Sequence, residues 1–336
     1  IDHVVLERDR VAERWRSGRW DSLVANGPAW HDRFPGLAFE GVDPDAFPGK
    51  ERVAAYFAEY AERIAAPIRT GVDVTSVRRH ADRRGFRAET SAGPIDADFV
   101  VAATGPFQTP VIPPLVPSDA PVLQLHSNDY RNPEQLPPGA VLVVGGGASG
   151  VQISDELQRA GRSVHLAIGP HTRPPRRYRD RDFVWWLGVL GLWDLQTPPA
   201  GAEHVTIAFS GAYGGRTIDF RDLAAEGMTL YGRAAAYADG VVRFADDLAA
   251  NIAQGDAYYL ELLDLADLNF TGNVEGRHLP ADEADVVVCD AVLGNVSIKL
   301  VEGVTLAITD MFRAERSEEH TSETPVTATS RMPSSA

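Results

Sequence analysis

A glycine-rich turn between an apolar run and a helical pattern constrains this chain more than any other feature. The run AVLVV (140–144) is continuous and apolar, which is typical of a central strand in a parallel sheet. The turn Gly145-x-Gly147-x-x-Gly150 follows, then the helix-like VQISDELQRA, and then a second apolar run over 163–168. Strand, turn, helix and strand in this order predict a parallel βαβ unit and therefore an α/β fold.

The glycines of this turn have separate roles in a dinucleotide site. The first allows a tight turn, the second lets the backbone approach a diphosphate, and the third lets helix and strand pack closely. The free N–H groups at the start of the helix would then face the phosphates. A purely structural glycine turn is the alternative, but the strand before and the helix after favour dinucleotide binding. We predict cofactor contacts from Gly145, Gly147, Ser149 and Gly150.

The segment after the second strand indicates which nicotinamide cofactor is bound. NAD-binding proteins place an acid at the end of this strand, whereas Ile168 and Gly169 stand there in this chain. Three arginines, Arg173, Arg176 and Arg177, follow within one short loop, and guanidinium groups suit a 2′-phosphate. The pattern favours NADPH, and a solvated basic loop is the alternative.

The chain opens on a strand-like pattern, residues 3–7, that ends in Glu7. An acid in this position binds ribose hydroxyls in dinucleotide folds, and its glycine loop lies about 20 residues earlier. We therefore expect residues to precede Ile1, although a surface glutamate after a strand is also common. The later pattern predicts a helix over 50–66 and short strands over 71–78, 84–90 and 97–103.

Composition limits the partners of the chain. The net charge of -15 opposes binding to nucleic acid or to an anionic membrane. The longest apolar stretch, 183–193, is far shorter than the ~20 residues that span a bilayer. The single Cys289 excludes an internal disulfide and a two-thiol redox centre, which fits a reducing cytoplasm. No metal-ligand spacing stands out, and the oligomeric state stays open.

Taken in chain order, several motifs resemble the flavin-containing monooxygenases over residues 1–268. A family fingerprint, Phe-x-Gly-x-x-x-His-x-x-x-Tyr, is matched only in its second half, because Ala120 and Val122 stand at its Phe and Gly positions. The matching features are Glu7 after a strand, Asn26 within WDSLVANGP, the turn Thr104-Gly105 after Ala103, His126 with Tyr130, and the glycine loop 145–150.

This resemblance implies a flavin that NADPH reduces and that uses O2 to oxygenate a nitrogen, sulfur or carbonyl centre of a small molecule. It implies a catalytic Asn26 beside the flavin ring, although most loop asparagines only serve turns. Thr104 and Gly105 would link the two nucleotide domains, and His126 and Tyr130 would brace the hinge between them. A remnant that binds NADPH without turnover is the alternative.

The expected fold is an incomplete flavoprotein with two Rossmann-like dinucleotide-binding domains. Residues 1–120 would form a partial FAD-binding domain without its first glycine loop, and residues 121–268 an NADPH-binding domain. The runs NFTGNVEGR, ADVVVCD and GNVSIK resemble fatty-acyl phosphate acyltransferases and predict an unrelated α/β fragment over 269–312. That resemblance leaves phosphate acyl transfer as a third possible function.

The end of the chain has a different character. Residues 313–336 are poor in apolar residues and predict a disordered tail. From Arg316 the run RSEEHTSE and the residues after it are similar to translated sequencing-library adapter. We therefore expect an artificial join near residue 268, with a natural fusion as the alternative.

Overall fold

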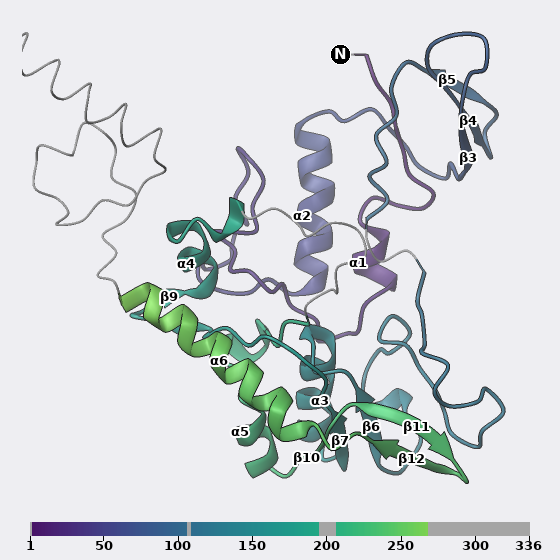
Figure 1. The fold of residues 1–336 in the computed structure, drawn as a ribbon. Coiled ribbons are helices and arrows are strands. Elements are labelled where there is room, and N and C mark those ends of the chain that lie inside the picture. Colours follow the sequence, from purple (N-terminus) through teal and green to yellow (C-terminus); the bar gives the residue numbers. More distant parts are fainter. Residues whose placement is uncertain (1, 106–108, 195–205, 268–336) are drawn as a thin grey trace, which may run out of the picture. The chain divides into compact units, whose positions relative to one another are not determined.

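The computed structural model describes residues 2–105, 109–194 and 206–267 (Figure 1). The chain divides into two units, Ile1–Leu268 and Asn269–Ala336. The second unit lies outside the described residues, and so do the predictions for the acyltransferase-like segment 269–312 and for the tail 313–336.

The described elements are short, apart from three helices. The helices are α1 (Glu13–Ser17), α2 (Lys50–Arg63), α3 (Ala148–Arg159), α4 (Phe183–Val189), α5 (Phe220–Ala225) and α6 (Leu248–Asp267). The strands are β1 (Val5–Leu6), β2 (Ile68–Arg69), β3 (Val74–Arg79), β4 (Phe86–Thr90), β5 (Ile95–Ala97), β6 (Val141–Val144), β7 (Val164–Ala167), β8 (Arg177–Tyr178), β9 (Arg181–Asp182), β10 (Thr229–Tyr231), β11 (Ala234–Ala238) and β12 (Val241–Phe244). Single 3-10 turns occupy Pro133–Gln135, Leu192–Asp194 and Ala212–Gly214.

The predicted βαβ unit is confirmed by β6, α3 and β7. β6 pairs in parallel with β7, from Val141 opposite Val164 to Val144 opposite Ala167, and β10 extends the sheet on the far side of β7. The expectation of a central position for β6 is wrong among the described strands, because the order β10-β7-β6 leaves it at an edge. Val144 is accordingly 56% exposed.

The N-terminal region contains a parallel pair and a small antiparallel sheet. β1 pairs with β2, and β3, β4 and β5 form a separate sheet in that order. The predicted helix over 50–66 and the strands over 71–78 and 84–90 are confirmed as α2, β3 and β4, with bounds shifted by a few residues.

The predicted strand over 97–103 is wrong. β5 ends at Ala97, and the apolar side chains of Phe99 and Val101 are 83% and 86% exposed. A strand exists only where a neighbour accepts and donates its backbone hydrogen bonds. No described strand pairs with residues 98–103, so their apolar pattern does not become a strand.

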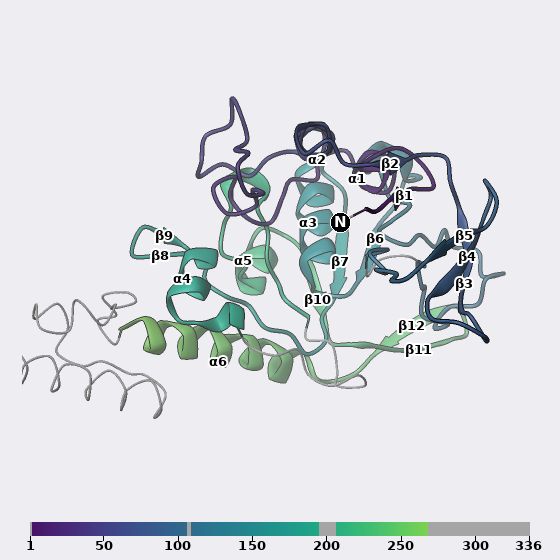
Figure 2. The ribbon, with the colours of Figure 1, turned by 90° about the horizontal axis from the view of Figure 1, so that it is seen from above.

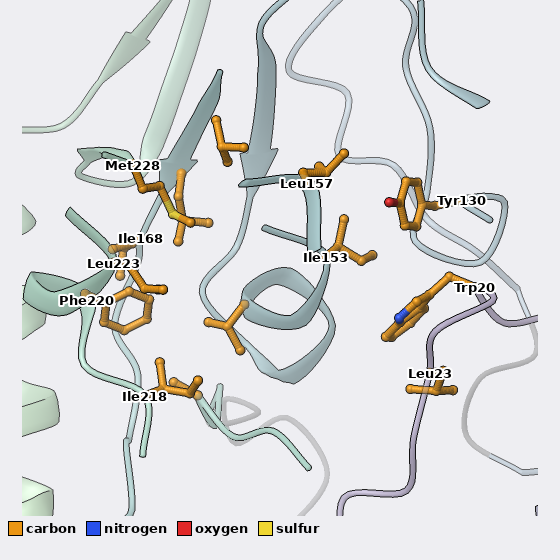
Figure 3. Close-up of a cluster of buried hydrophobic side chains, with 14 residues drawn as sticks. Trp20, Leu23, Tyr130, Ile153, Leu157, Ile168, Ile218, Phe220, Leu223 and Met228 are labelled. Carbon is orange, nitrogen blue, oxygen red and sulfur yellow. The ribbon is translucent and has the colours of Figure 1, made fainter. Parts of the chain in front are cut away.

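One core cluster surrounds α3 and draws on both halves of the first unit. Figure 3 shows Trp20 and Tyr130 on one side of this helix and Phe220 and Leu223 on the other. A second, smaller cluster packs against α2 and includes the fully buried Tyr56. Segments before residue 30 and after residue 140 therefore share a hydrophobic core.

The long helix α6 closes the described part of the chain. Figures 1 and 2 both show it running past α4 and α5. Asp256 of α6 accepts hydrogen bonds from Arg221 of α5 and from Arg173 of the loop after β7. Charge pairing thus holds α6 against the segment that follows the βαβ unit.

Candidate functional site

The loop between β6 and α3 requires glycine at two positions. Gly145 has φ +112°, a backbone conformation that side chains with a Cβ rarely adopt. A Cβ on Gly150 would lie 1.9 Å from the carbonyl oxygen of Gly145, so the turn can close this tightly only around glycine. Gly145 therefore allows the tight turn, and Gly150 allows the start of the helix to approach the end of the strand closely, which are the two roles that the sequence predicts for them.

The same loop leaves the start of α3 without a capping side chain among the described residues and without an acid in the first turn. A Cβ on Gly145 would meet no atom within 4 Å, and Ser149 is exposed. The first N–H groups of a helix have no intrahelical partner and carry the positive end of its dipole. This geometry fits a diphosphate, with Thr206 beside Gly147 as the nearest wall.

Asn26 lies against α3, where it contacts Gln152, two residues after the glycine loop. Its side-chain Oδ1 accepts a hydrogen bond from Nε2 of Gln152 at 2.8 Å. Its main-chain oxygen accepts a second hydrogen bond, from Nη1 of Arg176 at 2.7 Å. Asn26 itself is exposed, whereas Gln152 and Arg176 are buried. The structure therefore brings the predicted flavin-side asparagine against α3, the helix that follows the predicted nicotinamide-side glycine loop.

Arg176 is a buried cation with partners inside the chain. Its guanidinium lies 4.2 Å from the ring centres of Phe47 and of Phe209, and it pairs with Asp182 at 2.7 Å. Burial lowers the pKa of Arg176, and the carboxylate of Asp182 opposes that shift. The predicted contact of Arg176 with a 2′-phosphate does not fit this position, because the arginine is enclosed and already paired.

The other two arginines of the loop differ in exposure. Arg173 is buried and pairs with Asp256 at 2.5 Å and with Asp219 at 3.4 Å. Hydrogen bonds from Arg221 and Arg173 lower the pKa of Asp256 to about 2, against the effect of burial. Arg177, in β8, is exposed. Of the three arginines predicted to bind the 2′-phosphate, Arg177 alone is exposed and therefore accessible to a ligand.

Glu7 follows β1 at the carboxyl end of a parallel pair. Its backbone N–H donates to the carbonyl oxygen of Arg69 at 3.0 Å, and its side-chain Oε1 accepts from the backbone of Asp9 at 2.9 Å. The side chain is partly exposed. Thr104 and Gly105 are exposed too, and the hydrogen bonds of the described residues do not connect them to the glycine loop.

His126 and Tyr130 belong to one turn that packs on α3. The hydroxyl of the buried Tyr130 donates to Glu156 of α3 at 2.8 Å. Burial, followed by this hydrogen bond, raises the pKa of Tyr130 far above its usual value, so the hydroxyl stays protonated. Nδ1 of His126 accepts from the backbone N–H of Asn128 at 3.1 Å. The hydrogen bond of His126 thus stabilises the turn itself, and that of Tyr130 holds the turn against α3.

Sequence reasoning missed two buried polar residues beside these motifs. Gln152 is one of them. The other is Lys50 at the start of α2, whose Nζ lies 3.1 Å from Oδ1 of Asp21. Asn132 donates to the other oxygen of Asp21 at 2.7 Å, and this bond, then the bond from Lys50, lowers the pKa of Asp21. These partners are too far apart in the chain for a local pattern to reveal them.

The described residues contain neither a candidate membrane span nor a candidate metal site. No helix in the described ranges is both long and apolar enough to cross a membrane. Among the same residues, no group of three or more His, Cys, Asp or Glu side chains is placed to hold a metal ion.

Two family models match separate parts of the chain. Residues 34–187 match the family described as pyridine nucleotide-disulphide oxidoreductase. Residues 257–327 match the family described as fatty acid synthesis protein. The first match contains the glycine loop, Asn132 and Arg177, and the second begins inside α6.

Individual relatives fall into the same two groups. A CzcO-like uncharacterized oxidoreductase of Geobacillus kaustophilus is 39% identical over 191 residues, which is 56% of this chain and 53% of the relative. An indole-3-pyruvate monooxygenase of rice, Oryza sativa subsp. japonica, is 31% identical over 176 residues, 50% of this chain and 42% of the relative. A phosphate acyltransferase of Endomicrobium trichonymphae is 51% identical over 55 residues, 16% of each chain.

The alignments cover only part of each relative. The chain spans about half the length of the two oxidoreductases and a much smaller part of the acyltransferase. The α/β fold of the pyridine nucleotide-disulphide oxidoreductases is therefore covered in part. The chain joins a segment of the flavin-dependent oxidoreductases, related to the flavin-containing monooxygenases and the CzcO-like proteins, to a C-terminal segment that matches phosphate acyltransferases.

Proposed function

We propose that residues 1–268 serve a flavin-dependent monooxygenase that uses FAD, NADPH and O2 to oxygenate a nitrogen, sulfur or carbonyl centre of a small molecule. One observation carries this proposal: Asn26, the residue expected beside the flavin, is hydrogen-bonded to Gln152 of α3, two residues after the glycine loop expected to hold the nicotinamide nucleotide. Such a neighbourhood is what hydride transfer between two bound cofactors needs, because the reacting atoms must approach closely.

Each retained residue has a physical role in this proposal. The backbone of Gly145, Gly147 and Gly150 and the first N–H groups of α3, near Ser149, hold the diphosphate of NADPH. Arg177 pairs with the 2′-phosphate, which distinguishes NADPH from NADH. When bound, the flavin supplies the redox and oxygen chemistry.

The remaining residues act on the flavin side and at the hinge. Glu7 accepts hydrogen bonds from the ribose hydroxyls of FAD. Asn26 donates a hydrogen bond beside the flavin ring. Thr104 and Gly105 form the turn between the two nucleotide-binding regions, and His126 and Tyr130 brace it. Tyr130 does not act as an acid or base, because its raised pKa keeps the hydroxyl neutral.

Flavin retention tests the proposal directly. Purified protein is mixed with FAD, freed of unbound flavin and given NADPH under air. We expect a retained flavin absorbance band that bleaches with NADPH and returns as O2 is consumed, with NADH much less effective. Loss of all flavin during desalting, or bleaching that is equally fast with NADH, contradicts the respective parts of the proposal.

A second function, NADPH binding without turnover, is favoured by one observation. The glycine turn and the uncapped start of α3 lie within residues 145–159, so they can take up a diphosphate whether or not a flavin is bound. Titration calorimetry combined with an oxygen electrode separates the two functions. A binding module takes up NADPH and consumes no O2 in the presence of FAD.

A further inference from the structure

Gln152 is a buried polar residue at the contact between α3 and the segment that carries Asn26. It is only 5% exposed. Its Nε2 lies 2.8 Å from Oδ1 of Asn26 and 3.5 Å from the main-chain oxygen of Phe209. A single amide group therefore serves two acceptors from two different segments.

This arrangement determines which end of each amide faces the other. A main-chain carbonyl can only accept hydrogen bonds, so the end of Gln152 that faces Phe209 must be the NH2 group. The same NH2 group faces Asn26, and two NH2 groups cannot bond to each other. Asn26 must therefore turn its oxygen toward Gln152, and its own NH2 group is left on the other end of the amide.

The second anchor of Asn26 acts on its backbone. Nη1 of Arg176 donates to the main-chain oxygen of Asn26, and Arg176 is itself held by Asp182. Arg176 thus fixes where residue 26 lies, whereas Gln152 fixes how its side-chain amide is rotated. Because Asn26 is exposed, the NH2 end of that amide is accessible to a ligand.

The oxygen end of the Gln152 amide is unfavourable for the stability of the fold. Its Oε1 is buried and has no hydrogen-bond partner among the described residues. A buried acceptor without a partner destabilises the fold, so an apolar side chain would serve packing better at this position. The cost is understandable if the NH2 group of Gln152 is needed for its bond to Asn26.

We propose that Gln152 is a positioning residue that locks the amide of Asn26 with its NH2 group outward, so that Asn26 offers a hydrogen-bond donor, and never an acceptor, to the flavin. The identity of that ligand rests on the proposed function. The orientation of Asn26 does not, because it follows from contacts within the chain.

The first experiment tests the contact without any cofactor. Urea unfolding midpoints are measured for the full chain, for Asn26→Ala, for Gln152→Ala and for the double variant, since such a cycle isolates the coupling of two side chains. We expect the double variant to unfold at nearly the same midpoint as Gln152→Ala, because the bond is lost once only. Additive shifts of the two single variants would overturn the proposal.

The second experiment tests the direction of the amide in the flavin-loaded protein. Glutamate at position 152 can only accept, so Gln152→Glu draws the NH2 group of Asn26 inward and turns its oxygen toward the ligand. Asn26→Asp also presents an oxygen outward while it still accepts from Gln152. We therefore expect both variants to shift the bound-flavin absorbance band in the same direction and to lower the product formed per NADPH several-fold.

Controls separate positioning from general damage. Ser154, on the same helix, is fully buried and its hydroxyl also lacks a partner among the described residues, so Ser154→Ala is a matched change that should leave the flavin band unchanged. NADPH affinity, measured by calorimetry, should stay within about twofold in all variants, because the glycine loop is intact. Unequal or opposite spectral shifts for Gln152→Glu and Asn26→Asp would overturn the proposal. If the unaltered protein binds no flavin, the proposed function and the ligand named here fall together, and the unfolding cycle alone decides the orientation of Asn26.

Discussion

Gly147 differs from the other two glycines of its loop in what surrounds it. Gly145 is fixed by its positive φ and Gly150 by the nearby carbonyl oxygen, so substitution at either disturbs the turn itself. Gly147 has φ −79°, which any residue adopts, and a Cβ there would meet mainly Cγ2 of Thr206, at 2.9 Å. If the contact with Thr206 is removed by mutation, a remaining requirement for glycine at position 147 can be attributed to a ligand.

This difference leads to a prediction for the phosphate site. Gly147→Ala in a Thr206→Ala background should lower NADPH affinity at least tenfold, because the methyl group blocks close approach of the diphosphate to the backbone. Calorimetry measures the affinity, and Thr206→Ala alone is the control. Unchanged affinity in the double variant would show that no phosphate approaches Gly147.

Arg177 gives a prediction for cofactor choice. Arg177→Ala should weaken NADPH binding by about 10- to 100-fold and leave NADH binding unchanged, since a charge-assisted hydrogen bond contributes about 1.5–3 kcal/mol. Arg181→Ala is the matched control, because Arg181 is exposed on the paired strand β9. Equal losses for both variants would mean that the loop attracts the cofactor only through its overall charge.

Residues that act through long-range contacts could not be predicted from the sequence. The glycine loop and Asn26 carry local motifs, so both could be named in advance. Gln152 looks like an ordinary polar position of a helix, and its bond to Asn26 spans 126 residues. The burial of Arg173 and Arg176 was equally hidden, because Asp256 is supplied by α6 and the rings around Arg176 come from Phe47 and Phe209.

Elements were predictable where their hydrogen bonds are local. The helices α2 and α3 and the hairpin of β3 and β4 follow from spacing alone, and β7 follows from its place after a short helix. The edge position of β6 and the missing strand over 98–103 depend on whether a neighbour lies alongside, which no local pattern reports. The elements between 206 and 267 carried no motif, and the sequence predicted none of them.

The contact between α6 and the loop after β7 gives a prediction of pH dependence. His171 in that loop is buried, its Nδ1–H donates to the carbonyl oxygen of Gly169 at 3.0 Å, and its Nε2 has no partner among the described residues. Gly255 of α6 lies so close that a Cβ there would be 2.5 Å from Nε2. Burial lowers the pKa of His171, and the charge of Arg173 adds to this shift, whereas the hydrogen bond to Gly169 and, less strongly, the charge of Asp256 oppose it.

The sign of the effect follows from the neutral ring. A histidine whose pKa is lower in the folded protein than in the unfolded chain stabilises the fold fully above about pH 6.5, and that contribution is lost as the pH falls below this value. The free energy of unfolding, measured by urea titration, should therefore fall between pH 7 and 5, by at most about 1.4 kcal/mol per pH unit from this group. His171→Asn should show a smaller fall over the same range. An unchanged slope would mean that other groups cause the acid sensitivity.

At the scale of the whole molecule, the division into two units leads to a prediction for nucleotide binding by the first unit. The glycine loop, Asn26 and their partners all lie in the unit Ile1–Leu268. A variant that ends at Leu268 should therefore bind NADPH with an affinity within about twofold of the full chain and should unfold at the same urea midpoint. Calorimetry and urea titration measure both quantities. A marked loss of affinity would show that residues 269–336 contribute to the nucleotide site, and a lower midpoint would show that they contribute to the stability of the first unit.

The cluster around α3 has a practical consequence for anyone who wishes to dissect this polypeptide. Trp20 and Leu23 cover the same helix that Phe220 and Leu223 cover from the opposite side. A fragment that begins at residue 121 lacks Trp20 and Leu23, so the apolar surface that these two side chains cover would be exposed to water. The nucleotide-binding half, expressed alone, should therefore aggregate. Supplying residues 1–120 in trans should restore its solubility.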